Sequence, residues 1–209
     1  GFGYQYKMSA LSELYTEIIQ CQRCEIAQLR THVVPGEGAE NAEILFIGEA
    51  PGYHEDQLGR PFVGQAGQFL ERLLASIDLK REQVYIANVI KCRPLGNRDP
   101  LPTEVSKCRG WLEKQIELIA PRMIVTLGRF SMAMFFPGKT ISKIHGMAQK
   151  RGNIIYYAMY HPAAALHQHG LRREIEADMQ KIPLLLAQEK TMPEIEPPLQ
   201  PAQLKMFEV

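Results

Sequence analysis

The stretch AEILFIGEAPG, residues 42–52, decides the fold of this chain. Its first six residues form an almost continuous apolar run, and GEAPG then places two glycines and a proline in a turn. A strand that is apolar on both faces is typical of a parallel sheet covered by helices on both sides. The glycines would let backbone N–H groups approach a ligand closely, although GEAPG taken alone fits an ordinary turn better than a binding loop.

Three further apolar runs follow along the chain. They are VYIANV (84–89), MIVTL (123–127) and IIYYAM (154–159). Segments that read as helical lie between and after them, at 67–77, 103–119, 129–136 and 171–187. This alternation predicts an α/β fold with a parallel sheet, and in such sheets ligands bind beyond the carboxyl ends of the strands.

Length and composition indicate one domain. The chain has 209 residues, of which 45% are hydrophobic, which is ample for a single core. We expect that domain to span residues 9–188. Residues 1–8 are expected to be an expression remnant or a disordered extension, and residues 189–209, which contain four prolines, an extended tail.

Charge and hydropathy restrict the environment of the protein. The formal net charge is only +1, so a nucleic-acid partner would have to meet a local basic surface. No apolar run is long enough to cross a bilayer, and no leader of the signal-peptide kind is evident. We therefore expect a cytoplasmic monomer without membrane contact, in a reducing compartment that disfavours disulfides.

Four cysteines form a candidate metal site. Cys21 and Cys24 make a CxxC pair just after a predicted helix at 9–19, while Cys92 and Cys108 each lie between two basic residues. Four thiolates can hold an iron–sulfur cluster or a zinc ion, and cationic neighbours would offset their charge or meet phosphate. The alternative is four unrelated buried thiols, since free cysteine is commonly buried.

Two more loops carry candidate functional side chains. RPFVGQAGQ, residues 60–68, holds Phe62 between a rigid proline and a flexible glycine; such a ring is usually core, but it could also stack on a planar base. HPAAAL, residues 161–166, follows the last apolar run. A lone histidine is more often structural than catalytic, but His161 shares the strand-end crevice with the other loops, which makes it a functional candidate.

Taken together, these stretches resemble the family-four uracil-DNA glycosylases of the uracil-DNA glycosylase superfamily. The likeness rests on the CxxC, GEAPGYHED, GRPFVGQAGQ, NVIKCRPLGNRDP, CRGWL and HPAAAL, between Cys21 and Leu166. It implies a three-layer sandwich whose central sheet has four parallel strands. It also implies an enzyme that flips uracil out of DNA and hydrolyses its N-glycosidic bond, leaving an abasic site in base excision repair.

The resemblance also assigns a cofactor and partners. It implies a 4Fe–4S cluster held by Cys21, Cys24, Cys92 and Cys108, with zinc as the second choice, and a protein associated with the nucleoid of a bacterial-type cell. The four ligands would fold the loop between Cys92 and Cys108 and turn Lys91, Arg93, Lys107 and Arg109 toward DNA phosphates.

Five side chains take roles from the family. Phe62 corresponds to the stacking platform and Asn88 to the base reader, whose amide offers both a donor and an acceptor. Glu55 matches the residue placed against C5 of the base, where the methyl group of thymine would collide. His161 matches the histidine that stabilises the departing uracil anion, and Leu166 the apolar wedge that fills the gap, although ordinary helix packing is its alternative.

One position departs from sister families, which carry aspartate or asparagine there to position water. This chain has Ala50, which predicts dissociative chemistry dominated by leaving-group stabilisation. Asn97 is the candidate for positioning water, and Glu49 is the other nearby polar group, although it could simply bond to loop N–H groups. Gly52 would allow the loop backbone to approach the substrate.

A related branch traps the sugar covalently through a histidine in an inserted basic loop. The corresponding region here, GNRDPLPTE, contains no histidine, and His145 belongs to a different loop, where it would contact the DNA backbone or serve the structure. We expect no covalent adduct.

Two questions stay open at this stage. Residues 203–207, QLKMF, resemble the peptide by which repair proteins dock on a sliding clamp, but their apolar end could equally fold back on the core. Rival functions are a glycosylase of the same fold that acts on another deaminated base, such as hypoxanthine, and a non-catalytic module that holds a lesion.

Overall fold

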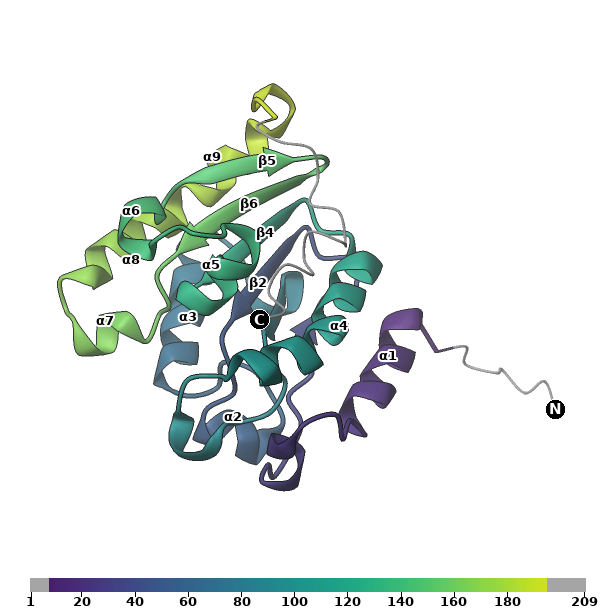
Figure 1. The fold of residues 1–209 in the computed structure, drawn as a ribbon. Helices are drawn as coiled ribbons and strands as arrows, with labels where there is room; N and C mark the ends of the chain where they lie inside the picture. Colours follow the sequence, from purple (N-terminus) through teal and green to yellow (C-terminus); the bar gives the residue numbers. More distant parts are fainter. Residues whose placement is uncertain (1–7, 195–209) are drawn as a thin grey trace.

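A parallel sheet forms the centre of the protein. The computed structural model describes residues 8–194. Four parallel strands lie in the order β3–β2–β4–β6, with β2 at Ile44–Gly48, β3 at Tyr85–Asn88, β4 at Met123–Leu127 and β6 at Ile154–Met159 (Figure 1). These are the four expected strands, within two residues at each end.

Two short antiparallel strands extend the sheet to six. β1, Glu37–Gly38, pairs with β3 at one edge, and β5, Ala148–Arg151, pairs with β6 at the other. The expected count of four missed both because neither is an apolar run: β1 has two residues, and β5 reads AQKR. Edge strands are commonly short or charged, which protects them from pairing with other chains.

Helices cover both faces of the sheet, which gives the expected three layers. One layer holds α1 (Ala10–Ile19), α4 (Pro102–Ile119) and α5 (Arg129–Phe135), and the other holds α3 (Gln65–Ala75), α8 (Leu171–Gln180) and α9 (Ile182–Ala187). Short helices and 3-10 turns lie in the loops, at α2 (Tyr53–Leu58), α6 (Ile141–Ile144), α7 (Ala164–His167), Glu25–Gln28, Arg81–Gln83 and Leu95–Asn97.

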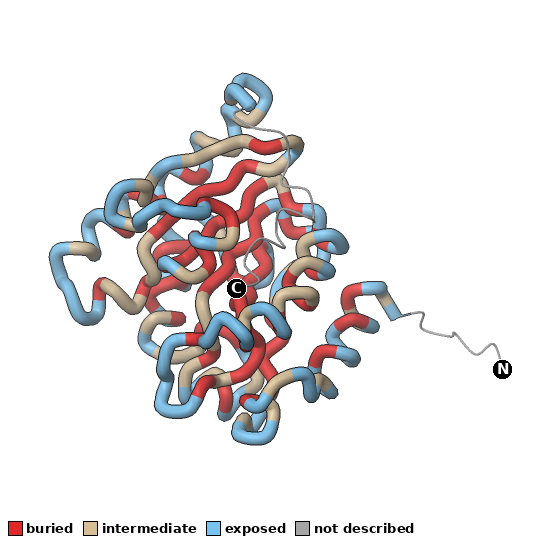
Figure 2. Tube along the Cα trace, in the orientation of Figure 1, coloured by how far each residue is buried: buried red, intermediate tan, exposed pale blue. Residues whose placement is uncertain are grey.

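Alternation of side chains along the strands explains the continuous apolar runs. In β2, Leu45 and Ile47 pack into the layer of α1 and α4, while Ile44 and Phe46 pack into the layer of α3 and α8. All four are buried, as are the neighbouring strands in Figure 2. Burying each such side chain contributes about 1.5–3 kcal/mol, so both faces of the sheet stabilise the fold.

The end of the described chain differs from expectation in two ways. The helix predicted at 171–187 is divided at Lys181 into α8 and α9, because Pro183 has no N–H to continue the helical hydrogen bonds. Residues 189–194 contact the body: Arg122 pairs with Glu189 at 2.6 Å, and Gly152 N donates to Glu194 Oε1 at 2.9 Å. The clamp-like peptide at 203–207 lies outside the described residues.

Among residues 8–194, the helices are too short or too polar for one of them to span a membrane.

Candidate active site and metal centre

The candidate site lies at the carboxyl edge of the parallel sheet. Gly48 ends β2, Asn88 ends β3, Gly128 follows β4, and His161 follows β6 after one intervening residue. Because these strands are parallel neighbours, their carboxyl ends bring the loops together. Phe62 joins them from the loop between α2 and α3.

Asn88 and Phe62 meet at Gly48. A Cβ atom on Gly48 would lie 2.5 Å from Asn88 Oδ1 and 2.6 Å from Phe62 Cζ, so glycine is required where the two side chains crowd the backbone. Asn88 is buried, and its main-chain oxygen accepts a hydrogen bond from Lys91 Nζ at 2.9 Å. Its side-chain amide makes none of the hydrogen bonds found among residues 8–194, so its donor and acceptor are available to a ligand.

His161 is held as a neutral hydrogen-bond donor. Its Nδ1 accepts from the main-chain N–H of Ala163 at 3.0 Å, which places the ring proton on Nε2. Burial lowers the pKa of His161 to about 4, so the imidazole is uncharged at neutral pH. The ring stacks on that of Phe62 with centroids 5.4 Å apart and planes at 21°. A neutral imidazole that carries its proton on Nε2 can stabilise a developing oxyanion.

Glu49 lies close to His161. A Cβ atom on Gly128 would be 2.9 Å from Glu49 Oε2 and 3.1 Å from His161 Cβ, so the carboxylate and the imidazole flank the same turn. Burial raises the pKa of Glu49 to about 6, and the nearby Arg129 guanidinium opposes this rise. Ala50, the next residue, is partly buried and packs against the core of the α1 and α4 layer.

Glu55, Gly52 and Asn97 lie close to one another. Glu55 Oε1 accepts from Gly52 N at 3.4 Å, while Glu55 Oε2 is buried and has no partner among the described residues. A Cβ atom on Gly52 would lie 4.0 Å from Asn97 Nδ2, and Asn97 Oδ1 accepts from Arg93 Nε at 2.6 Å. The free Glu55 oxygen is an acceptor without a protein donor, as expected of a group that meets a ligand.

The expectation that Lys91 contacts DNA is wrong. Lys91 is 1% exposed, and its ammonium donates to Asn88 O and, at 2.6 Å, to Gln115 Oε1. Burial lowers the pKa of Lys91 to about 8. The side chain therefore supports the main chain of Asn88 from inside the protein, a role for which the sequence carries no signal beyond the spacing of three residues.

The other proposed DNA contacts are more accessible. Leu166 is 39% exposed on α7, five residues beyond His161, and Lys107 is exposed. Arg93 is half-buried and binds Asn97, while Arg109 Nε donates to Glu113 Oε1 at 2.6 Å. Contact of these residues with phosphate stays a prediction. His145 belongs to the structure: its Nδ1 lies 2.7 Å from Asp178 Oδ2.

The four cysteines surround one cavity on the α1 and α4 side. All line it, together with Arg30, Lys91 and Lys107. Three N–H groups point at the sulfurs: Trp111 Nε1 lies 3.3 Å from Cys21 Sγ, Lys91 N 3.3 Å from Cys108 Sγ, and Arg30 Nη1 3.5 Å from Cys92 Sγ. Sequence reasoning missed Arg30 and Trp111, because nothing but proximity to cysteine in the fold marks them.

The chemistry of this cavity fits a metal group. Burial raises the pKa of the Cys92 thiol to about 12 and also raises that of Cys108, so the thiolates need a cation to form. Within residues 8–194, no three His, Cys, Asp or Glu side chains are arranged to hold a single ion. The four thiols nevertheless line the same cavity.

Comparison with known proteins places the chain in a family. The family model of the uracil DNA glycosylase superfamily matches residues 35–182. The chain is 47% identical to a type-4 uracil-DNA glycosylase of Archaeoglobus fulgidus, over 84% of this chain and 92% of that protein. It is 45% identical to one from Sulfurisphaera tokodaii, over 84% of each, and 40% identical to one from Thermotoga maritima, over 84% and 95%. The chain therefore belongs to the uracil-DNA glycosylase superfamily, in its type-4 family.

Proposed function

We propose that this enzyme removes uracil from DNA by hydrolysing the N-glycosidic bond of deoxyuridine, which leaves an abasic site for base excision repair. The observation that carries the proposal is the neutral His161, whose ring proton is on Nε2, beside Phe62 and the unpaired amide of Asn88. The names of the type-4 relatives agree with this reaction.

Recognition of the base begins with its extrusion from the duplex, which costs a few kcal/mol. We assign Phe62 as the surface on which the flipped base stacks. The Watson–Crick edge of uracil offers O4 as an acceptor and N3–H as a donor, which the amide of Asn88 can match with Nδ2–H and Oδ1. Cytosine presents the opposite pattern and would leave this buried amide unpaired, so it is rejected.

Two further side chains would contact the base or the space that it leaves. Glu55 would face C5 of the base, where it leaves no room for the methyl group of thymine. Its unpaired Oε2 supports a position at the ligand. Leu166, which is exposed on α7, would enter the space that the extruded base leaves in the stack.

His161 would drive the bond cleavage. As the C1′–N1 bond breaks, its electron pair moves onto the uracil, and charge grows on O2, where Nε2–H donates a hydrogen bond. Loss of one such donor in other enzymes costs about 3 kcal/mol. The depressed pKa matters here, because the imidazole stays a neutral donor across the physiological range.

Water then attacks C1′ of the sugar cation and forms the C1′–OH bond of the abasic site, and the proton that the water loses neutralises the departed uracil anion. Ala50 offers no polar group, so another residue must steady the cation and the water. We assign this role to Glu49, whose carboxylate flanks the same turn as His161. Asn97, our candidate from the sequence, has its carbonyl oxygen engaged by Arg93 and directs its amide nitrogen toward Gly52; its part in positioning water stays a prediction.

The four cysteines would hold a 4Fe–4S cluster. A cluster has several metal atoms and can bind thiolates spread around a cavity, whereas one zinc ion needs all four sulfurs at about 2.3 Å. Bound there, the cluster would link the CxxC, the start of the Cys92 loop and α4 through its bonds to the cysteine sulfurs. The N–H groups of Arg30, Lys91 and Trp111 would stabilise these sulfurs. We assign it a structural role.

The test is direct. Incubated with a uracil-containing oligonucleotide, the protein with its metal intact should release free uracil and leave alkali-labile sites, and it should do so faster than with a hypoxanthine-containing oligonucleotide. Tight lesion binding without base release would identify a non-catalytic module, and faster hypoxanthine release would identify the rival glycosylase. Either outcome overturns the proposal.

A further inference from the structure

We propose that Arg81 is a positioning residue that holds Phe62 in the orientation needed for base stacking. The inference rests on the function proposed above. Its starting point is the backbone of Phe62, which has a φ of +51°. A bulky residue in this left-handed region is uncommon and costs on the order of 1–3 kcal/mol, so the surrounding structure must hold it there.

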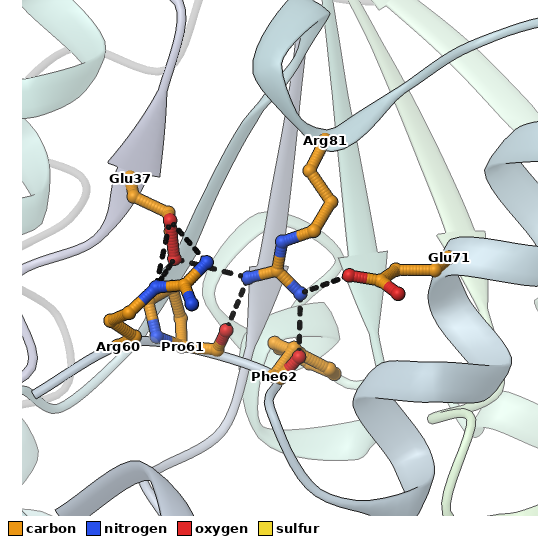
Figure 3. A network of polar contacts seen from close by, with 6 residues as sticks. All are labelled: Glu37, Arg60, Pro61, Phe62, Glu71 and Arg81. Carbon is orange, nitrogen blue, oxygen red and sulfur yellow. Dashed lines mark hydrogen bonds and ion pairs between the residues drawn. The ribbon is translucent and has the colours of Figure 1, made fainter. Parts of the chain in front are cut away.

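The Arg81 guanidinium binds the two carbonyl groups at this strained turn. Arg81 Nη2 donates to the main-chain oxygen of Pro61 at 2.5 Å, and Nη1 donates to that of Phe62 at 2.6 Å (Figure 3). The side chain of Arg81 is 8% exposed, so these bonds are shielded from water. One planar group thus fixes the orientation of two consecutive peptide units.

The guanidinium is itself held from two other elements. Glu37 on β1 lies 3.2 Å from Arg81 Nη2, and Glu71 on α3 lies 3.5 Å from Nη1. Arg60 binds the same Glu37 from the surface, at 2.9 Å. Arg81 begins the 3-10 turn that leads into β3, so the arrangement ties the Phe62 turn to the sheet and to α3 (Figure 3).

Close packing against α3 also confines this turn. A Cβ atom on Gly67, in the first turn of α3, would collide with Phe62 O, so the helix backbone lies directly against that carbonyl group. If the peptide returned to an ordinary conformation, the ring would leave its contacts with Gly48 and His161. The stacking surface would then move away from Asn88, which reads the base.

A lysine could not replace Arg81. An ammonium group is a point charge, whereas the planar guanidinium presents several N–H groups in a fixed fork that matches two acceptors at once. We therefore expect Arg81→Gln and Arg81→Lys both to reduce base capture. Arg60→Gln is the matched control, because it removes a guanidinium from Glu37 without touching the carbonyl groups of Pro61 and Phe62.

A double-mutant cycle with Phe62→Ala tests the inference, using the purified metal-loaded protein and single-turnover uracil release. Arg81→Gln should lower kcat/KM about 10- to 100-fold in the wild-type background, as expected for loss of charge-assisted hydrogen bonds. In the Phe62→Ala background it should change kcat/KM less than about twofold, because Arg81 acts through the ring. Arg60→Gln should stay within about twofold of the wild type.

Binding separates positioning from general damage. Arg81→Gln should weaken binding to an oligonucleotide with a non-hydrolysable 2′-fluoro-deoxyuridine about as much as it lowers kcat/KM, and leave binding to undamaged DNA unchanged. If Arg81→Gln does not fold, Glu71→Gln replaces it, with a smaller loss that must also vanish with Phe62→Ala.

The outcomes distinguish the two claims. A wild-type protein that releases no uracil would refute the proposed function. A wild-type protein that releases uracil, with defects of Arg81→Gln and Phe62→Ala that multiply, would overturn the inference alone. Full activity in Arg81→Lys would also overturn it, because the charge would then suffice without the fork.

Discussion

His161 combines burial with one hydrogen bond to reach a defined chemical state. The N–H of Ala163 fixes the tautomer, and burial lowers the pKa to about 4. Both effects favour the same species, a neutral ring with its proton on Nε2. Such a ring donates a hydrogen bond to a forming anion without first taking up a proton from the solvent.

The pH dependence of the rate follows from the titration of His161 and Glu49. His161 is neutral above about pH 5 because its pKa is lowered, so its donor persists across the neutral range. Glu49, with a pKa raised to about 6, loses its negative charge as the pH falls through that value. Single-turnover rates should therefore fall as the pH is lowered from 7 to 5. The Glu49→Gln variant should be slow over this whole range and should not show this fall. A rate that instead rises as the pH falls would make the imidazolium the active form.

Lys91 is a buried cation with two neutral acceptors. Replacing it with methionine leaves Asn88 O and Gln115 Oε1 without their donor. Each unpaired buried group costs about 1–3 kcal/mol, so the free energy of unfolding should fall by at least that amount in urea titrations of the metal-loaded protein. The exposed Lys143 provides the control, and Lys143→Met should be as stable as the wild type. Equal stability of Lys91→Met would show that these bonds contribute nothing.

At the scale of the elements, the cysteine cavity lies between the segment after α1, the loop that follows β3, and α4. These segments are distant in the sequence. A metal group between them would act as a cross-link that forms only in the folded state.

Substitution of one ligand should therefore act on the fold. Cys92→Ser should yield protein with little iron or sulfide, without the brown colour of a cluster, and with a lower melting temperature. Metal and sulfide analysis with visible absorbance and thermal unfolding would check this. If the wild-type protein is colourless and holds one zinc ion, the bound metal is zinc and not a cluster. Unchanged stability of Cys92→Ser would refute the structural role.

The elements were predictable to different degrees. The four parallel strands were, because burial on both faces demands uninterrupted apolar residues such as Leu45 and Phe46. The edge strands were not, because β5 is polar and is defined by its pairing with β6. The division of the last helix was marked by Pro183, a signal that the sequence contained and the prediction overlooked.

The site shows the same division. The places of Asn88, Phe62 and His161 at the carboxyl edge of the sheet were predictable, because these residues follow strand ends or sit in recognisable loops, and their roles stay predictions. Arg81 and Lys91 were not, because a charged residue reads as surface until the fold surrounds it with carbonyl groups. The roles of both depend on contacts between segments, which no local pattern encodes.

For the whole molecule, the layout of the loops predicts the fate of the sugar. His145 is the histidine that was compared with the sugar-trapping histidine of the related branch. It contacts Asp178 and is held in the structure. A denaturing gel of the protein with uracil-containing DNA should show no protein bound irreversibly to DNA. A stable cross-linked band would mean that a side chain attacks the sugar.

The central claim is that uracil leaves as an anion stabilised by the neutral His161. The most direct test compares His161→Ala with the wild type on DNA that contains uracil or 5-fluorouracil, whose anion is more stable. The defect on uracil should be about 100-fold or more, as for loss of an oxyanion donor, and it should be clearly smaller on 5-fluorouracil. An equal defect on both bases would contradict the claim.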